Sequence, residues 1–288
     1  MKHFKFIDSH CTDKTFFIMG ATGGMGEQLS LQLAKQNATL FLAGRNKEKL
    51  KKLRKKIAKI NNRALIFEID LTSKNSITES VHTAFSISKK INYLVLASGI
   101  FTPYNFADIE PYEKKKTYLT NVYGPYLLCE EFIRRWKKES YFKSIIFISS
   151  IAGAGALPNQ RQVYAFSKKM IIELCKKYFA LYGDAIHCNC FCPGPTETNM
   201  WKEVCASLSL HAKISVEEVV ALYKNQGHEI SSVTQTVDSL FHLINATDNG
   251  VLYFPSLHKK EQLIPRKDFT KRNFKKIDRF LHSMRGIS

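Results

Sequence analysis

Short apolar runs alternate along this chain with longer amphipathic stretches, and that alternation restricts the fold to a few architectures. Six runs are short enough to be buried strands and are rich in β-branched and aromatic residues: 16–19, 39–43, 64–69, 93–97, 144–149 and 185–191. Between them apolar residues recur three and four apart, which predicts helices over 27–35, 47–59, 77–88, 114–138 and 164–181. This repetition predicts an α/β protein with a doubly wound parallel sheet and helices on both faces.

The remainder of the chain extends the same unit rather than starting a second one. Helical patterns return at 216–223 and 233–244, and the apolar run 251–254 predicts a seventh strand. A chain of 288 residues with 44% apolar content can bury one large core, and no Pro-, Gly- or Ser-rich linker divides it. We therefore predict a single domain over 15–255, with an N-terminal extension over 1–14 and a basic C-terminal tail over 256–288.

The first predicted strand is joined directly to the first helix by a glycine-rich turn, Gly20-Ala21-Thr22-Gly23-Gly24-Met25-Gly26. Glycine lets a backbone approach a pyrophosphate closely, and the free N–H groups and dipole of a helix N-terminus favour its negative charge. In this position the turn predicts a Rossmann-type dinucleotide site, although a tight turn without a ligand has the same composition. The expected cofactor contacts in the turn are Gly20, Thr22, Gly24, Met25 and Gly26.

The second predicted strand ends at Gly44-Arg45-Asn46, where a dinucleotide of this class places its adenosine ribose. An acidic residue at this point binds the 2′-hydroxyl of NAD(H) and repels a 2′-phosphate, whereas Arg45 would pair with that phosphate. The sequence therefore favours NADP(H) over NAD(H). The alternative is that Arg45 only solvates the start of a helix.

Tyr164 and Lys168 are four residues apart on a predicted helix, so both side chains lie on one face. A cation beside a phenol stabilises the phenolate and lowers the phenol pKa toward the range useful in acid–base chemistry. Such a pair alone is common on solvated helices. Its context is more specific, because Ser150 follows the fifth strand at the carboxyl edge of the sheet, where ligands bind.

Together these residues resemble the short-chain dehydrogenase/reductase (SDR) family, in its single-domain branch, over roughly residues 15–198. The glycines match the family's TGxxxGxG turn, and Asn121, Ser150, Tyr164 and Lys168 match its catalytic tetrad. The resemblance implies hydride transfer between NADP(H) and a carbonyl/alcohol pair, with Tyr164 as proton donor. It also implies that Lys168 binds the nicotinamide ribose, Ser150 orients the carbonyl and Asn121 holds a water. Further cofactor contacts implied by the match are Asp70, Leu71, Ala97, Gly99, Pro193, Gly194, Thr196 and Thr198.

Some positions depart from the family pattern. Met19 replaces the Thr that precedes the glycine turn, and Leu96-Ala97-Ser98-Gly99 replaces the motif NNAG. Tyr164 lies fourteen positions after Ser150, one more than is usual in the family. The glycines also fit GxxGxxG, which is the pattern of a longer branch that modifies sugar nucleotides. Asn121 and the Pro193-Gly194 pair favour the single-domain branch.

Two other classes of function were weighed against an oxidoreductase. A catalytically idle, NADP-binding regulator or scaffold would use the same pocket, but the complete tetrad argues against it. A formal charge of +18 favours anionic partners in general. Aromatic residues are not interleaved with Lys and Arg as in a nucleic-acid-binding module, so we expect no nucleic-acid partner.

The composition also bears on location, metals and partners. No uncharged apolar run is long enough to span a membrane, and the N-terminus has no signal-like apolar core, so we expect a cytoplasmic protein. Seven cysteines match neither a disulfide framework nor a zinc site, and Cys188, Cys190 and Cys192 are interpreted as small buried hydrophobes; no metal is expected. The family resemblance implies a homo-oligomer formed through the helices at 114–138 and 164–181.

The segment after Thr198 bears on the substrate, a small carbonyl compound or alcohol. The segment contains the apolar residues Met200, Trp201, Val204, Leu208 and Leu210. These residues favour an apolar substrate, although packing of the segment onto the body explains them equally well.

The tail has the composition of a basic amphipathic helix. Residues 259–288 contain ten Lys or Arg against three Asp or Glu, and Phe274, Ile277, Leu281 and Met284 recur at helical spacing. One interpretation is that this apolar stripe docks on the body of the enzyme. The other is peripheral contact with an anionic membrane, close to a lipid-like substrate.

Overall fold

The computed structural model describes residues 11–103, 108–155, 162–225, 227, 229–246, 248–263 and 277–283. Its single sheet has the strand order β3-β2-β1-β4-β5-β6-β7-β8, and every neighbouring pair is parallel except β7 and β8. The strands are β1 (Thr15–Met19), β2 (Thr39–Gly44), β3 (Ala64–Glu68), β4 (Tyr93–Leu96), β5 (Ser144–Ile148), β6 (His187–Phe191), β7 (Val251–Phe254) and β8 (Lys259–Gln262). The predicted doubly wound parallel sheet is confirmed.

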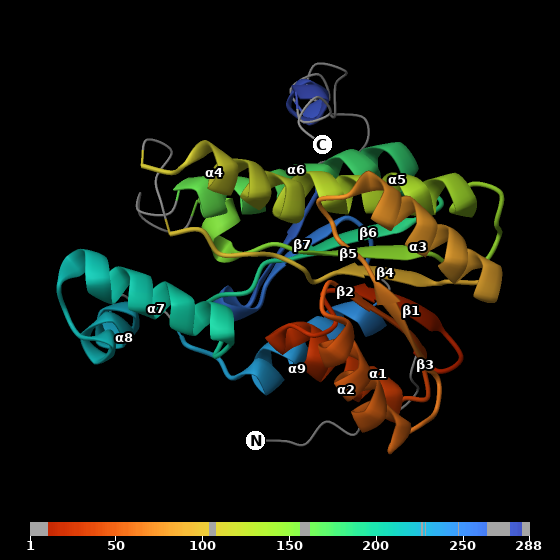
Figure 1. Cartoon of the computed structure of the whole chain (residues 1–288), viewed down its shortest axis with the longest axis horizontal. Helices are drawn as coiled ribbons and strands as arrows, with labels where there is room; N and C mark the ends of the chain where they lie inside the picture. The colour runs from red at the N-terminus through yellow and green to blue at the C-terminus, as the bar shows by residue number, and fades with distance from the viewer. Residues whose placement is uncertain are drawn as a thin grey trace.

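Two layers of helices cover the sheet (Figure 1). One layer contains α3 (Lys74–Ile87), α4 (Pro111–Tyr118), α5 (Gly124–Trp136) and α6 (Gln162–Tyr182), and the other contains α1 (Gly24–Lys35), α2 (Lys47–Ala58) and α9 (Val233–Asn245). Side chains of β1 alternate between the layers, because successive residues of a strand point to opposite faces. Phe17 packs with Phe132 in one core cluster, and Phe16 packs with Leu29 in the other.

The helix predicted over 114–138 is interrupted in the structure. Between α4 and α5 the chain forms a π-helix, Leu119–Tyr123, which carries Asn121. Pro125 lacks an N–H group and cannot donate to the carbonyl of Asn121, so regular α-helical bonding fails at this point. A Cβ on Gly124 would lie 2.5 Å from the Leu71 carbonyl oxygen, so only glycine allows this close approach of the helix to the sheet.

Beyond the sheet edge, α7 (Asn199–Ala212) and α8 (Val216–Asn225) form a helical hairpin that stands away from the two layers (Figure 1). It has its own small core, in which Cys205, Val219 and Tyr223 are buried together. A parallel bridge between Thr196 and Ser231 joins the two chain segments that connect the hairpin to the body. The hairpin therefore packs as a unit of its own at the carboxyl edge of the sheet.

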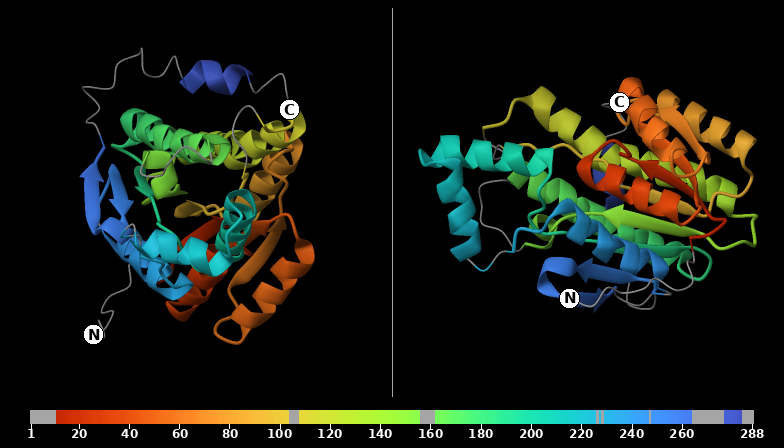
Figure 2. Two further views of the ribbon diagram at one scale, coloured as in Figure 1. Left: turned by 90° about the vertical axis from the view of Figure 1, so that its left-hand side faces the viewer. Right: turned by 90° about the horizontal axis from the view of Figure 1, so that it is seen from below.

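Two parts of the segment assigned to the tail are described. Residues 259–262 pair with β7 as β8, and residues 277–283 form a short helix over the layer of α4, α5 and α6 (Figures 1 and 2). Ile277 and Leu281 of this helix are 4% and 2% exposed in the main core cluster, which supports docking of the apolar stripe on the body. Phe274 and Met284 lie outside the described residues.

The cysteines are all buried as free thiols. Burial raises the pKa of Cys188 and Cys190 well above the ordinary value, so both thiols stay neutral. Among the described residues no group of three or more His, Cys, Asp or Glu side chains is arranged to hold a metal ion, and none of the described helices is long and apolar enough to cross a membrane.

Candidate active site

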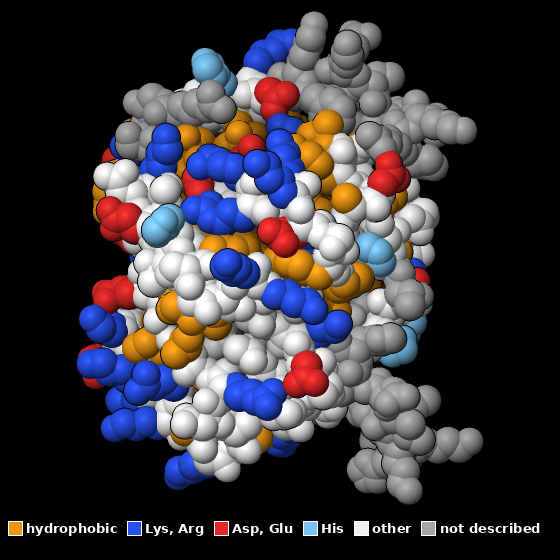
Figure 3. Space-filling view, turned by 90° about the vertical axis from the view of Figure 1, so that its right-hand side faces the viewer, with side chains coloured by type: hydrophobic (Ala, Val, Ile, Leu, Met, Phe, Trp, Pro, Cys, Tyr) orange, Lys and Arg blue, Asp and Glu red, His pale blue; other side chains and the backbone are white. Residues whose placement is uncertain are grey.

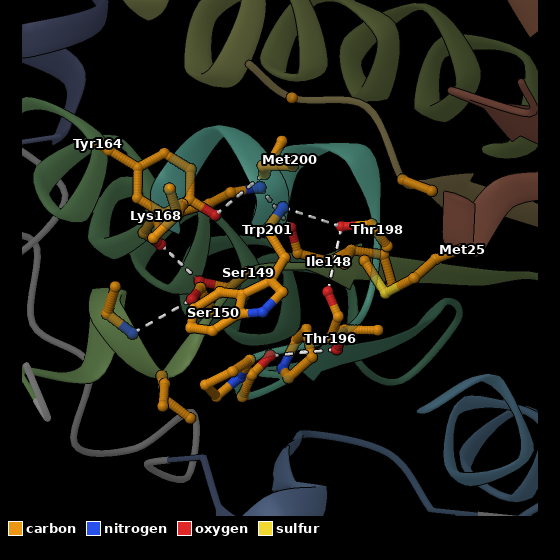
Figure 4. Close-up of a pocket in the computed structure, with 18 of the residues that line it drawn as sticks. Met25, Ile148, Ser149, Ser150, Tyr164, Lys168, Thr196, Thr198, Met200 and Trp201 are labelled. Atoms are coloured by element: carbon orange, nitrogen blue, oxygen red, sulfur yellow. Dashed lines mark hydrogen bonds between the residues drawn. The ribbon is translucent and has the colours of Figure 1, made fainter. Parts of the chain in front are cut away.

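A chamber opens at the carboxyl edge of the sheet, where the ends of several strands meet the glycine turn, α6 and the start of α7 (Figure 4). This is the edge at which doubly wound sheets bind ligands. Ten of the residues proposed from the sequence line the chamber: Met25, Ala97, Gly99, Ser150, Tyr164, Lys168, Pro193, Gly194, Thr196 and Thr198. The fold thus brings residues from distant parts of the sequence together in one compact site.

The glycine turn forms a cradle in which side chains have no room. Gly20 has φ of +88°, and a Cβ there would lie 2.6 Å from the Ser98 backbone nitrogen. A Cβ on Gly24 would lie 2.7 Å from Cγ2 of Thr198. Gly23 caps α1 without any side-chain hydrogen bond, so the first N–H groups of the helix have no side-chain acceptor. This geometry fits a dinucleotide pyrophosphate.

The adenosine end of the site lies where β2 and β3 end side by side. The Ile69 N–H donates to the Gly44 carbonyl at 3.0 Å, so Arg45 and Asp70 follow neighbouring strands at the same edge. Arg45 is exposed, and no described acidic side chain forms an ion pair with it. Asp70 accepts from the N–H and hydroxyl of Thr72. Leu71 is buried, and Thr22 lies beside the end of β2.

Much of the positive charge of the chain lies beside Arg45. Residues 45–63, which contain α2, include ten Lys or Arg and one Glu. Lys47, Lys51 and Lys56 pair with Glu68, Glu48 and Glu27, and the other basic residues of α2 form no ion pair with a described residue. Figure 3 shows Lys and Arg side chains on both the upper and the lower part of its face, and the group at the lower left has few acidic neighbours. This field favours an anionic ligand at the adenosine end.

Tyr164 and Lys168 face the chamber from the first turns of α6. The Lys168 Nζ lies 5.8 Å from the centre of the Tyr164 ring and donates to the Ile148 carbonyl oxygen at 3.1 Å. Burial lowers the pKa of Lys168 to about 8, against a smaller opposite effect of Cys190 and Cys192. A lysine in this range can change its charge near neutral pH.

The Tyr164 hydroxyl donates to Met200 Sδ at 3.7 Å, and Phe101 contacts the Tyr164 ring edge-on with 5.5 Å between the ring centres. Met200 and Trp201 both belong to the first turn of α7, and Figure 4 shows them beside Tyr164 and Ser150. The Tyr164 hydroxyl is therefore covered by the hairpin. A substrate carbonyl that accepts from Tyr164 has to displace the Met200 thioether.

The two serines after β5 have different environments. The Ser149 hydroxyl is buried and donates to the Lys168 carbonyl oxygen at 2.7 Å, which ties the strand end to α6. The Ser150 oxygen accepts from the Ala152 N–H at 3.2 Å, and its hydroxyl lines the chamber. Of the two, Ser150 is the one placed to donate to a substrate oxygen. Between Ser150 and Tyr164, residues 156–161 are outside the described part of the chain, so the place of the extra residue is not described.

Asn121 does not line the chamber but lies behind its wall. Its side chain accepts from the Ile100 N–H at 2.8 Å and donates to the Ile100 carbonyl at 2.9 Å and to the Ser167 oxygen at 3.0 Å. The side-chain oxygen and nitrogen of Asn121 are thus both engaged by protein. It connects the π-helix to the segment after β4 and to α6, next to Lys168.

Two hydroxyls at the site were not identified from the sequence. Ser98 Oγ and Ser256 Oγ are buried and have no hydrogen-bond partner among the described residues. Ser98 lines the chamber after β4, and Ser256 Oγ would lie 2.8 Å from a Cβ on Gly194. Unsatisfied buried hydroxyls, one next to the glycine cradle and one next to Gly194, fit a site that receives a polar cofactor. The altered NNAG motif pointed to Ser98, but no motif pointed to Ser256.

Comparisons with known proteins identify the family of the chain. The family model described as short chain dehydrogenase matches residues 14–208. The chain is 22% identical over 258 residues to a 3beta-hydroxysteroid dehydrogenase of Mediterraneibacter gnavus, covering 87% of this chain and 91% of that protein.

Among solved structures, an NAD+-bound xylitol dehydrogenase superposes with a TM-score of 0.76 at 21% identity, covering 85% of this chain and 98% of the other. The NADP-bound ElxO structure superposes with a TM-score of 0.72 at 20% identity, covering 84% and 97%. With the fold, the chamber and a family match over most of the chain in agreement, the chain belongs to the short chain dehydrogenase family of NAD(P)-dependent oxidoreductases.

Proposed function

We propose that this protein interconverts a carbonyl compound and an alcohol by hydride transfer, with NADP(H) as its preferred cofactor. The observation that carries the proposal is the meeting of Ser150, Tyr164 and Lys168 in one chamber beside the glycine turn. The cofactor, when bound, supplies or accepts the hydride. The glycine cradle, Arg45 and the unpaired Ser98 and Ser256 hydroxyls are the groups that would hold it.

In the direction of reduction, Tyr164 donates its hydroxyl proton to the substrate oxygen as that oxygen gains negative charge. Ser150 donates a hydrogen bond to the same oxygen and fixes its orientation. The Lys168 ammonium, close to the Tyr164 ring, stabilises the phenolate that remains. Asn121 fixes the position of α6 relative to the segment that follows β4. Its proposed water-binding role stays a prediction.

Arg45→Asp is expected to reverse the cofactor preference. Wild-type protein should bind NADPH more tightly than NADH, because Arg45 is exposed at the end of β2 without a competing acidic partner. The substitution replaces a phosphate-pairing cation with a repelling carboxylate, and loss of a charge-assisted hydrogen bond of about 1.5–3 kcal/mol corresponds to at least about tenfold weaker NADPH binding. Titration of both variants with both cofactors measures the ratio.

The matched control is Arg54→Asp, which changes an exposed basic residue of α2, the helix that follows Arg45. Its effect on NADPH should be small, should disappear at high salt, and should leave the NADPH-to-NADH order unchanged. If Arg45→Asp behaves like Arg54→Asp, Arg45 only solvates the start of α2 and the preference for NADP(H) has to be abandoned.

The chamber walls favour an apolar substrate. Met200, Trp201, Val204 and Tyr223 line it from the hairpin, and Trp201 contacts Tyr223 edge-on with 5.0 Å between the ring centres. Among the described lining residues Lys168 is the one charged side chain, and it is engaged by Ile148. A substrate carboxylate or phosphate would thus find no free cation among these residues.

The decisive experiment is turnover of NADPH by purified protein with a panel of aldehydes, quinones, sugars, cyclic ketones and aliphatic methyl ketones. Each methyl ketone is paired with its ω-carboxylate of equal length. We expect the neutral ketones to have the higher kcat/KM, rising with chain length. Equal or better turnover of the carboxylates contradicts an apolar substrate, and binding of NADPH with no turnover of any compound favours the idle regulator or scaffold.

The predicted homo-oligomer, cytoplasmic location and peripheral membrane contact stay predictions from the sequence.

A further inference from the structure

The short helix over 277–283 is held on the body by side chains at both of its ends. Ile277 and Leu281 are almost fully buried in the core cluster. Asp278 forms an ion pair with Lys177, whose side chain is 11% exposed. These contacts fix the helix against α6, more than a hundred residues earlier in the chain.

Phe280 of this helix completes a triangle of aromatic rings. Its ring centre lies 5.6 Å from that of Tyr118 and 5.7 Å from that of Phe166, and the Tyr118 and Phe166 centres are 5.9 Å apart. The three interplanar angles are 84°, 69° and 68°, so every pair has the favourable edge-to-face geometry. The triangle joins the C-terminal helix to the end of α4 and the start of α6.

Both of the rings that Phe280 contacts adjoin the proposed tetrad. Phe166 lies between Tyr164 and Lys168 on α6, and Tyr118 is the last residue of α4 before the π-helix that carries Asn121. The start of α6 meets the π-helix here, and on the inner side of this contact Asn121 donates to the Ser167 oxygen at 3.0 Å. On the outer side lies the triangle of rings. The start of α6 is thus held against the π-helix from two sides.

We propose that Phe280 is a positioning residue for the reaction, which holds the first turns of α6 against the π-helix so that Tyr164 and Lys168 keep their places in the chamber. This inference rests on the proposed function. Displacement of a reacting group by about 1 Å can lower a rate about a hundredfold, so a ring outside the chamber can affect catalysis strongly. Loss of the Phe280 ring leaves the direct Tyr118–Phe166 contact and the Asn121–Ser167 hydrogen bond to hold this part of α6, with the outer side of both rings uncovered.

The test is Phe280→Ala in the full-length protein, assayed with NADPH and the best compound of the carbonyl panel. We expect kcat per NADPH-binding site to fall about ten- to a hundredfold. The KM for NADPH should change less, because the glycine cradle and Arg45 lie away from the triangle and of the proposed cofactor contacts only that of Lys168 is displaced. The pH at which kcat declines should also shift, since the Tyr164–Lys168 arrangement changes. A smaller folded fraction alone moves neither the per-site kcat nor the pH profile.

Two further variants make the test specific. Phe280→Tyr keeps the ring and is expected to restore kcat to within about threefold, whereas His282→Ala changes an exposed residue of the same helix and should have no effect. Amide hydrogen exchange gives a readout that needs no substrate: in Phe280→Ala the amides of residues 163–169 should exchange faster, while those in the second half of α6 should not.

The proposal is overturned if Phe280→Ala has the same kcat per NADPH-binding site as the wild type and its amides at residues 163–169 exchange no faster. If that variant does not fold, Phe280→Leu replaces it, because leucine keeps the apolar volume without the ring; a wild-type kcat and pH profile then overturn the proposal in the same way. Failure of the proposed function can be distinguished from failure of this inference. In the first case the wild-type protein reduces no compound of the panel, while the exchange experiment on Phe280→Ala can still give its expected result.

Discussion

Tyr164→Phe is expected to abolish turnover while NADPH binding stays nearly intact. The substitution removes one hydroxyl, which in the structure donates to Met200 Sδ and in the proposed reaction donates its proton to the substrate oxygen. A positioned general acid contributes about a hundredfold to ten-thousandfold to the rate, so kcat should fall by at least about a hundredfold. The ring keeps its edge-on contact with Phe101, and the fold should be unaffected. Steady-state kinetics and NADPH titration measure the two effects.

The matched control is Tyr112→Phe, which removes the same hydroxyl from a ring that is 69% exposed on α4. Its kcat and NADPH affinity should equal those of the wild type. Retention of turnover by Tyr164→Phe within about tenfold of wild type would remove Tyr164 from the mechanism, because that loss is below the usual contribution of a general acid.

Most strands and helices could be predicted from the sequence, because the spacing of apolar residues in each segment is typical of one kind of secondary structure. Most of the six apolar runs are buried on both faces by helices, so apolar residues dominate them, whereas the edge strand β3 is partly exposed, with Leu65 37% exposed. The π-helix could not be predicted, since one extra residue between α4 and α5 leaves the apolar spacing on either side unchanged. β8 was missed because its sequence, KKEQ, is polar and strands at a sheet edge need no apolar face.

The candidate site shows the same division between local and tertiary information. The glycine turn, Arg45 and the Tyr164–Lys168 pair could be identified from the sequence, because each is a short segment whose geometry follows from its own secondary structure. Ser256 and Phe280 could not, because each reaches the site or its support through contacts with residues far away in the sequence. The cover of Met200 over the Tyr164 hydroxyl likewise depends on how the hairpin packs, which no spacing encodes.

Lys168→Ala is expected to lower both kcat and NADPH affinity, because one ammonium is proposed to serve Tyr164 and the nicotinamide ribose. Loss of a hydrogen bond from a charged donor of about 1.5–3 kcal/mol weakens NADPH binding about ten- to a hundredfold. The rate should fall by at least about a hundredfold as the phenolate loses its neighbouring cation. Lys169→Ala is the control, since Lys169 is the adjacent residue of α6 and is exposed.

The pH dependence separates the ribose contact from a general effect on the fold. Burial lowers the pKa of Lys168 from its ordinary 10.5 to about 8, so in the free protein the ammonium is present below that pH and is lost above it. Wild-type affinity for NADPH should therefore fall as the pH rises through about 8, while the weaker affinity of Lys168→Ala should stay flat over the same range. Parallel pH profiles for the two proteins, or a loss of rate in Lys168→Ala with undiminished NADPH affinity, would show that Lys168 does not bind the ribose.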